Sequence, residues 1–422
     1  MKKIAIIGAG ITGVTTAYAL LNRGFEVTVF DRNRYSGMET SFANGGQLSA
    51  SNAEVWTQWG TIFKGIKWMF TPGAPLLVNP KPSWHKYSWM AEFMANIPNY
   101  ERNTIATARL AIAAREHLKS YAEKEGFAFD CENEGILHIY KTKKEYDHAT
   151  RVNEMLAKGG LEREAIAPED IASIEPALQD DYYGAYFTRS DFTGDIHKYT
   201  TNLAKACTNR GATFVYDADV RRLKKDADGV SVRWKRDDKH TVDQFDAVVL
   251  CAGVNSRSFA EQLGDRVNIY PVKGYSITVN LNDEESQKAA PTVSILDDES
   301  KLVTSRLGKD RFRIAGTAEF NGYNKDIRDD RIAPIVKWCA RNFPDVSTEH
   351  CVPWAGLRPM MPNMMPKVGP GRAAGVFYNT GHGHLGWTLS AATAEGVADA
   401  VLEASKQAGR KPVQASIRPS TA

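Results

Sequence analysis

Three glycines near the start of the chain have the spacing of a phosphate-binding turn. The apolar run 3–7 leads directly into Gly8, Gly10 and Gly13, which form a G-x-G-x-x-G pattern. Between a strand and a helix, the first glycine permits a tight turn and the second lets the backbone approach a pyrophosphate. The third lets the helix pack closely against the strand. The free N–H groups and the dipole at the start of that helix favour a phosphate there.

An acidic residue completes this unit. A helical pattern over 14–23 is followed by a second apolar run over 27–30, which ends at Asp31 with Arg32 beside it. A carboxylate at the end of the second strand is placed to accept hydrogen bonds from ribose hydroxyls. Because both strands, the helix and the acid are present, we interpret the segment as a dinucleotide-binding unit rather than a structural turn.

The bulk composition limits the classes of protein to consider. A chain of 422 residues, 43% hydrophobic and 24% charged, is expected to form two domains, each with its own core. The net charge of +3 and the lack of a basic stripe argue against nucleic-acid binding. No apolar run approaches the ~18 residues that span a bilayer. The five cysteines include no C-x-x-C pair, which is typical of reduced thiols in a cytoplasmic protein, and we expect no metal site.

The predicted elements are α/β throughout, but the nucleotide-domain pattern is interrupted twice. It stops after Asp31, resumes with a helical pattern at 196–210, and returns near the C-terminus as a strand, a glycine turn at 381–386 and a long helix. Alternating strand patterns fill most of 267–318. We therefore expect a discontinuous nucleotide domain formed by 1–55, 193–265 and 355–422, and a second α+β domain on a mixed or antiparallel sheet formed by 56–192 and 266–354.

Several motifs together give the chain a family resemblance that runs nearly from end to end. They are Gly8–Gly13, Glu39–Ser49, Ile66–Phe70, Tyr270–Ser276, Trp354–Met360 and Asn379–Thr388. With these motifs the chain resembles the glycine-oxidase and D-amino-acid-oxidase-like flavoproteins, and more closely the bacterial D-amino acid dehydrogenases. Gly45 is one departure, since an alanine is expected at this position.

The resemblance implies a Rossmann-type domain that binds FAD non-covalently. It also implies oxidative deamination of D-amino acids to 2-oxo acids and ammonia by hydride transfer to FAD, with electrons passed to a quinone or another respiratory acceptor. The expected location is the cytoplasm, with peripheral contact to the inner face of the cell membrane. The residues expected to bind the cofactor are Gly8, Gly10, Gly13, Asp31, Arg32, Thr40, Ser41, Gly46, Gln47, Leu48, Val220, Ala252, Gly253, Gly381, His382, Gly383, Leu385 and Gly386.

Arg358 and Tyr275 are the residues expected to bind the substrate. Arg358 lies in an apolar stretch that suits an unpaired charge poorly, and its planar guanidinium matches a carboxylate in bidentate fashion. The alternative is a structural ion pair with an internal acid. The hydroxyl of Tyr275 would bond the substrate's carboxylate or amine, although a tyrosine on a strand often serves packing alone. No side chain is identified as a catalytic acid or base.

Other interpretations stay open at this level. The pocket would equally suit secondary amino acids such as sarcosine, D-proline or hydroxyproline derivatives, and a flavin-binding protein without catalysis is a more distant alternative. His382 and His384 favour flavin contact over metal binding, because no carboxylate or cysteine supports them. The tryptophan-rich segment 56–100 would form a lid, a membrane anchor or ordinary core.

Overall fold

The glycine loop lies at the centre of a mostly parallel six-stranded sheet. The computed structural model describes residues 2–69, 71, 73–178 and 180–409. The strand order is β19-β20-β13-β1-β2-β9, and every neighbouring pair is parallel except β19 with β20. The strands are β1 (Lys3–Ile7), β2 (Glu26–Phe30), β9 (Thr213–Val215), β13 (Ala247–Leu250), β19 (Lys367–Pro370) and β20 (Val376–Thr380).

The two faces of this sheet pack against different elements. Successive side chains of a strand point to opposite faces, so each strand contributes to the core on either side. In β1, Ile4 and Ile6 face one core, formed with helices α1 (Ile11–Leu21), α7 (Ile196–Asn209) and α11 (Gly386–Gly409). Ala5 and Ile7 face the other core. That core is closed by helix α8 (Ser256–Gln262) and an antiparallel meander of β10 (Asp219–Asp226), β11 (Gly229–Arg236) and β12 (Lys239–Phe245).

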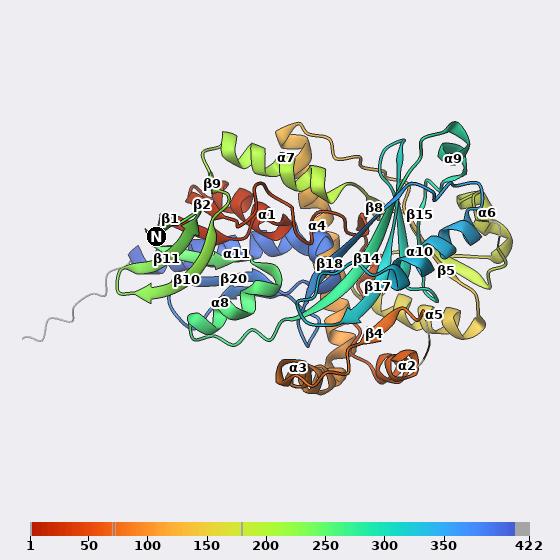
Figure 1. Ribbon diagram of the computed structural model, residues 1–422, viewed down its shortest axis with the longest axis horizontal. Coiled ribbons are helices and arrows are strands. Elements are labelled where there is room, and N and C mark those ends of the chain that lie inside the picture. Colours follow the sequence, from red (N-terminus) through yellow and green to blue (C-terminus); the bar gives the residue numbers. More distant parts are fainter. Residues whose placement is uncertain (1, 70, 72, 179, 410–422) are drawn as a thin grey trace, which may run out of the picture.

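The second half is built on a nine-stranded mixed sheet, seen at the right of Figure 1. Its order is β18-β14-β17-β16-β15-β5-β7-β6, and β4 pairs with β17. Most neighbours are antiparallel, whereas β15 with β5 and β17 with β4 are parallel. The strands are β4 (Leu76–Val78), β5 (Ile136–Tyr140), β6 (Glu164–Ile166), β7 (Gly184–Thr188), β14 (Tyr270–Asn280), β15 (Ser294–Asp297), β16 (Leu302–Arg306), β17 (Arg311–Phe320) and β18 (Cys351–Met360).

The remaining elements surround this sheet or connect the two halves. A short ribbon, β3 (Gln47–Leu48) with β8 (Phe192–Thr193), joins the loop after β2 to the chain before α7. The helices are α2 (Trp59–Met69), α3 (Trp84–Ala95), α4 (Tyr100–Glu125), α5 (Lys143–Lys158), α6 (Ile171–Ile174), α9 (Glu284–Ala289) and α10 (Asp329–Asn342). Within the described part of the chain, no helix combines the length and apolar character needed to cross a membrane.

The two halves are interleaved more closely than their expected boundaries suggest. Leu118 and Tyr121 of α4 lie in the core of the nucleotide half, although their segment was expected in the second domain. Conversely, the nucleotide domain was expected to resume at position 355, but β18 continues past this position and stays paired with β14 as far as Met360. Residues 410–422, expected to end the nucleotide domain, lie outside the described residues. The exact domain boundaries therefore stay a prediction.

Candidate active site

A cavity of about 910 Å³ extends from the glycine loop to the sheet of the second half. Its walls come from the ends of β1 and β13, the loop 39–49, the glycine turn 381–386 and strands β14, β17 and β18. Both predicted substrate residues line this cavity. So do all the predicted cofactor residues except Gly13 and Leu48. The structure thus brings together residues that are more than 300 positions apart in the chain.

The glycine loop needs each of its glycines for a different reason. Gly8 has a left-handed φ of +106°, and a Cβ there would lie 2.6 Å from the Cys251 carbonyl oxygen at the end of β13. A Cβ on Gly13 would lie 1.9 Å from the Gly8 carbonyl oxygen, so Gly13 serves close packing and does not line the cavity. Gly10 is the N-cap of α1 and lines the cavity without a side chain, so the first turn of this helix, apart from the N–H of Ile11 that Ser41 accepts, stays open for a pyrophosphate.

Asp31 lies at the carboxyl end of β2 and faces the cavity. Its carboxylate accepts hydrogen bonds from the N–H of Ala9 at 2.7 Å and from the N–H of Asn33 at 2.8 Å. Burial raises the pKa of this carboxyl group, and these hydrogen bonds oppose the rise. Arg32 also lines the cavity, but its guanidinium pairs with Glu39 at 2.5 Å. Val220 lines it from β10, next to an irregularity in the pairing with β11.

The loop after β2 connects the nucleotide site to the second half. Thr40 donates a hydrogen bond to the Leu357 carbonyl oxygen at 2.8 Å, and Ser41 Oγ accepts one from the N–H of Ile11 at 3.0 Å. Gly46 has a φ of +75° and lies against Ser305. In β3, Gln47 faces the cavity while Leu48 packs into the core, because neighbouring side chains of a strand alternate. Leu48 therefore supports the loop from behind.

The third segment of the site is the turn that precedes α11. Gly381 and Gly383 both have left-handed φ angles, +79° and +60°, which glycine adopts without strain. His382 Nε2 bonds the Thr393 hydroxyl at 2.9 Å, and burial lowers its pKa to about 3. This histidine is therefore neutral and held by α11. On the neighbouring strand end, Gly253 has a φ of +53° and lines the cavity beside Ala252.

These residues fit FAD. The open end of α1 suits its pyrophosphate and Asp31 suits its ribose. Further along the same cavity, two buried polar atoms, Gln47 Oε1 and Trp387 Nε1, have no hydrogen-bond partner among the described residues. Buried polar groups are normally satisfied, so these atoms indicate a ligand that offers both donors and acceptors. The isoalloxazine ring carries both kinds of group along its edge.

Arg358 supplies a partly buried positive charge at the far end of the cavity. Its guanidinium lies over Gly274, where a Cβ would be 2.4 Å from Nη2. It donates hydrogen bonds to the carbonyl oxygens of Thr317 at 2.5 Å and Gly316 at 3.2 Å. No carboxylate of a described residue lies within 4.0 Å, so the structural ion pair is not found. Burial lowers the pKa of Arg358 to about 10, which still leaves it charged at neutral pH.

Thr317 is a feature of this site that the sequence analysis missed. It has a φ of +57°, which is an outlier for a β-branched residue and costs about 1–3 kcal/mol. The conformation directs its carbonyl oxygen to Arg358, while its hydroxyl is buried, lines the cavity and lacks a described partner. The strain therefore accompanies the placement of two polar groups beside the arginine.

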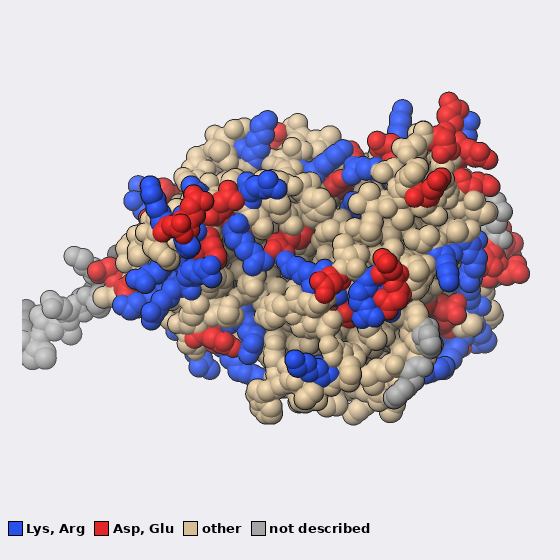
Figure 2. All heavy atoms as spheres, in the orientation of Figure 1, with Lys and Arg blue, Asp and Glu red and all other residues tan. Residues whose placement is uncertain are grey.

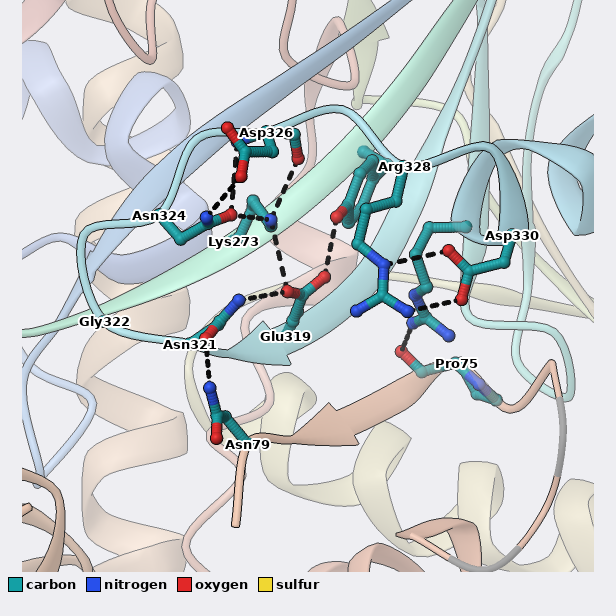
Figure 3. Close-up of polar contacts among 12 residues, drawn as sticks. Pro75, Asn79, Lys273, Glu319, Asn321, Gly322, Asn324, Asp326, Arg328 and Asp330 are labelled. Atoms are coloured by element: carbon teal, nitrogen blue, oxygen red, sulfur yellow. Dashed lines mark hydrogen bonds and ion pairs between the residues drawn. The ribbon is translucent and has the colours of Figure 1, made fainter. Parts of the chain in front are cut away.

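The hydroxyl of Tyr275 is engaged inside the protein. It donates to Glu319 Oε2 at 2.6 Å, so toward a substrate it is left to act as a hydrogen-bond acceptor. Figure 3 shows Glu319 between Lys273 and Asn321. The side chains of Lys273 and Glu319 are fully buried, with 3.2 Å between Nζ and Oε1. Burial raises the pKa of Glu319, but the hydrogen bonds from Tyr275, Lys273 and Asn321 outweigh this and lower it overall.

This buried pair also fixes one wall of the cavity. Lys273 Nζ donates to Asn324 Oδ1 at 2.8 Å and to the Asp326 carbonyl oxygen at 3.0 Å, in the loop after β17. Asn79, just after β4, donates to Asn321 Oδ1 at 2.6 Å (Figure 3). The wall formed by β4 and the end of β17 is thereby tied to β14.

The tryptophans of the segment 56–100 are divided between a core, the cavity wall and the surface. Trp89 is buried in a core with Phe93 and Tyr270. Trp56 and Trp68 line the cavity, and the ring of Trp56 stacks on His384 with centroids 4.8 Å apart. Trp59 and Trp84 are 57% and 83% exposed, on α2 and α3. The sequence analysis considered His384 for flavin contact, but it did not select the nearby Glu54, which belongs to none of its motifs.

Comparisons with known proteins agree with this geometry. The family model described as FAD dependent oxidoreductase matches residues 3–400. D-amino acid dehydrogenase 3 of Mesorhizobium japonicum is 61% identical, covering 95% of this chain and 97% of the relative. D-amino acid dehydrogenase of Paramagnetospirillum magneticum is 39% identical, with 94% of each chain covered.

Solved structures of the same fold include two more distant proteins. Glycine oxidase from Geobacillus kaustophilus has a TM-score of 0.73 at 20% identity, over 96% of this chain and 95% of the other. L-proline dehydrogenase from P. horikoshii has a TM-score of 0.75 at 17% identity, over 98% and 95%. The fold, the nucleotide cavity and the similarity along nearly the whole chain lead to one conclusion: the chain belongs to the FAD-dependent oxidoreductase family, together with the D-amino acid dehydrogenases.

Proposed function

We propose that this protein is an FAD-dependent D-amino acid dehydrogenase that converts D-amino acids to 2-oxo acids and ammonia. The observation that carries the proposal is Arg358, a partly buried cation that pairs with no acidic group among the described residues, in the cavity that also contains the nucleotide-binding loop. A buried charge is stabilised by a ligand of opposite charge, and the substrate's carboxylate supplies one. The 61% identical relative named as a D-amino acid dehydrogenase supports the same activity.

The residues of the cavity then have distinct tasks. Arg358 holds the carboxylate, using the part of its planar fork that Gly316 and Thr317 leave free. Tyr275, whose hydroxyl already donates to Glu319, accepts a hydrogen bond from the substrate's amine. These two anchors fix the orientation of the Cα–H bond and so remove much of the entropic cost of reaction.

Bound FAD supplies the acceptor for the hydride that leaves Cα. The glycine loop and the N-terminus of α1 hold its pyrophosphate, and Asp31 binds its ribose. The turn 381–386 presents backbone groups at the start of α11 toward the flavin, where the positive end of the helix dipole favours the negative charge that reduction brings. No covalent attachment is needed in this arrangement.

The electrons then leave the protein to a quinone, through contact with the membrane surface. Helix α2 supports this because it has two faces: Gly60, Thr61, Lys64 and Trp68 line the cavity, whereas Trp59, Phe63 and Ile66 are 57%, 66% and 49% exposed. Trp84 and Tyr87 of α3 are also exposed. In Figure 2 the lower margin, where Figure 1 places α2 and α3, is mostly uncharged, while charges of both signs are scattered elsewhere.

Anaerobic reduction of the bound flavin tests the proposal directly. The purified holoprotein is mixed with D- and L-forms of several amino acids, with sarcosine and with D-proline, and loss of flavin absorbance is followed. We expect D-amino acids to bleach the flavin faster than their L-forms, and a soluble quinone to restore the colour faster than oxygen does. Bleaching by sarcosine or D-proline alone would instead select the secondary-amine alternative, and no bleaching by any of them would refute the proposal.

A further inference from the structure

We propose that Glu54 is a specificity-determining residue that selects substrates whose side chain carries a hydrogen-bond donor, such as a hydroxyl or an amino group. This inference rests on the proposed function, because it assigns the substrate class of the same cavity. It goes further in predicting that the enzyme discriminates between amino acids of equal size and shape.

Glu54 is held firmly, and all of its protein partners use one oxygen. Oε1 accepts hydrogen bonds from the Tyr100 hydroxyl at 2.6 Å, from Gln58 Nε2 at 2.9 Å and from His148 Nε2 at 3.1 Å. None of the described residues donates to Oε2. Since a carboxylate has lone pairs on both oxygens, this arrangement leaves one oriented acceptor unused.

The unused oxygen belongs to a charged group inside the cavity. Glu54 lines the cavity, and a quarter of its side chain is exposed there. Burial raises the pKa of its carboxyl group, but His148, Tyr100 and the charge of Lys301 more than compensate, so the pKa is lowered overall. Among the described residues, no lysine or arginine pairs with it. Lys301, a cation of the same cavity, is engaged with Asp298 at 2.5 Å.

His384 connects Glu54 to the carboxylate anchor. Its ring stacks on Trp56, two residues after Glu54, and it lies within electrostatic range of both Arg358 and Glu54. Burial, followed by the charge of Arg358, lowers the pKa of His384 to about 4, so its ring is neutral, and the charges of both Arg358 and Glu54 act on it. A substrate anchored at Arg358 has its amine at Tyr275. The part left to extend past His384 toward Glu54 is the side chain.

A carboxylate in this position discriminates between substrates, because some substrate side chains hydrogen-bond its free oxygen and others leave that oxygen without a partner. A side-chain hydroxyl or ammonium group satisfies Oε2 with a charge-assisted hydrogen bond. An apolar side chain of the same size removes water from that oxygen and gives nothing in return. Sites built to bond a substrate donor reject analogues that lack it, because their own buried polar groups are then unpaired. Acidic side chains are rejected by like charge.

The first test compares matched substrates on the wild-type holoprotein. D-threonine is paired with D-valine, and D-lysine with D-2-aminoheptanoic acid, which has a methyl group in place of the lysine amino group, in anaerobic flavin reduction and in dye-linked steady-state assays. We expect the donor-bearing member to have a kcat/KM about ten- to a hundredfold higher in at least one pair, the range that hydrogen bonds to charged groups give. Equal values in both pairs would overturn the inference while leaving D-amino acid oxidation intact. No reduction by any of them would instead refute the proposed function.

The second test removes the charge without changing the size of the side chain. Glu54→Gln should bring the donor-to-apolar ratio of kcat/KM close to one, mainly by raising KM for the donor-bearing substrate, and should keep the flavin content. Glu101→Gln is the matched control, because Glu101 pairs with Lys158 on the surface, one residue from Tyr100. We expect its ratio to be that of the wild type. An equal loss on every substrate in Glu54→Gln would show that Glu54 contacts the common amine and would overturn the side-chain assignment.

Discussion

At the scale of single residues, Arg358 decides how the substrate is oriented. In the part of the chain that the structure describes, its guanidinium bonds two backbone carbonyl oxygens and no acid, so replacement by alanine removes the carboxylate's partner without leaving an internal acid unpaired there. Arg358→Ala should lower kcat/KM by about 30- to several-thousandfold, which corresponds to about 2–5 kcal/mol. Arg358→Lys should recover only part, because an ammonium group lacks the planar fork. Steady-state kinetics beside flavin content measure this. Normal kinetics in Arg358→Ala would make the arginine structural.

The residues that could be predicted from sequence are those whose role depends on local spacing. Gly8, Gly10 and Asp31 belong to one continuous βαβ unit, and Arg358 belongs to a short motif in an apolar context. Thr317 and Glu54 could not be found in this way. The strain at Thr317 depends on the register of β14 against β17, and the partners of Glu54 come from α4 and α5, 46 and 94 positions away. Likewise, Glu319, the partner of Tyr275, is 44 residues distant.

At the scale of elements, the contact between β1 and α1 is as important as the loop that joins them. A Cβ on Gly13 would lie 1.9 Å from the Gly8 carbonyl oxygen, so Gly13→Ala must push the helix away from the strand. We expect FAD loss and a destabilisation of about 1–3 kcal/mol. Gly396→Ala is the control: this exposed glycine of α11 has no neighbour closer than 3.8 Å. It should bind FAD normally and gain up to about 1 kcal/mol. Flavin content and urea unfolding compare the two, and equal behaviour would contradict the packing argument.

Helix α2 carries the prediction about electron exit. Phe63 is 66% exposed on the face away from the cavity, and a charge there should weaken contact with a bilayer by about tenfold or more, since burying a phenylalanine contributes about 1.5–3 kcal/mol. Phe63→Asp should slow reduction of a long-chain quinone in vesicles but not of a water-soluble dye. Val242→Asp is the control, because Val242 is 51% exposed on the meander of the other half. If the dye assay falls equally, or if both variants behave alike, α2 is not the contact surface.

At the scale of the whole molecule, the sequence predicts the two sheets better than it predicts the border between the two halves of the molecule. The parallel sheet follows from local patterns, such as the strand, glycine turn and helix at the start of the chain. The half to which α4 belongs does not follow from a local pattern. Its long amphipathic pattern shows that one face of the helix is buried, but it does not show which half of the molecule covers that face. Leu118 and Tyr121 pack with α1 and α11, which lie far away in the chain. Long-range packing therefore sets the domain borders.

The same burial makes the stability of the whole protein depend on pH. His138, His382 and His384 are buried, and burial lowers their pKa values, to about 3 for His382, to about 4 for His384 and well below the usual value for His138. In the unfolded chain each returns to about 6.5. Below that pH the unfolded chain binds protons that the folded protein does not. The histidine contribution to stability is therefore complete above pH 6.5 and is lost as the pH falls toward the folded-state values.

Replacing one of these histidines should make the free energy of unfolding depend less steeply on pH. His138 lies on β5, outside the cavity, where Nε2 bonds the Ser51 hydroxyl at 2.8 Å. One group contributes at most about 1.4 kcal/mol per pH unit, and it reaches this slope only where the unfolded histidine is fully protonated. Between pH 6.5 and 5.5 that histidine goes from half to almost fully protonated, so His138→Asn should lose about 1 kcal/mol less unfolding free energy than the wild type. His240→Asn, on the exposed part of β12, should behave as the wild type. Urea unfolding of the holoprotein at both pH values measures this. Parallel losses in all three proteins would mean that His138 takes up its proton in the folded state.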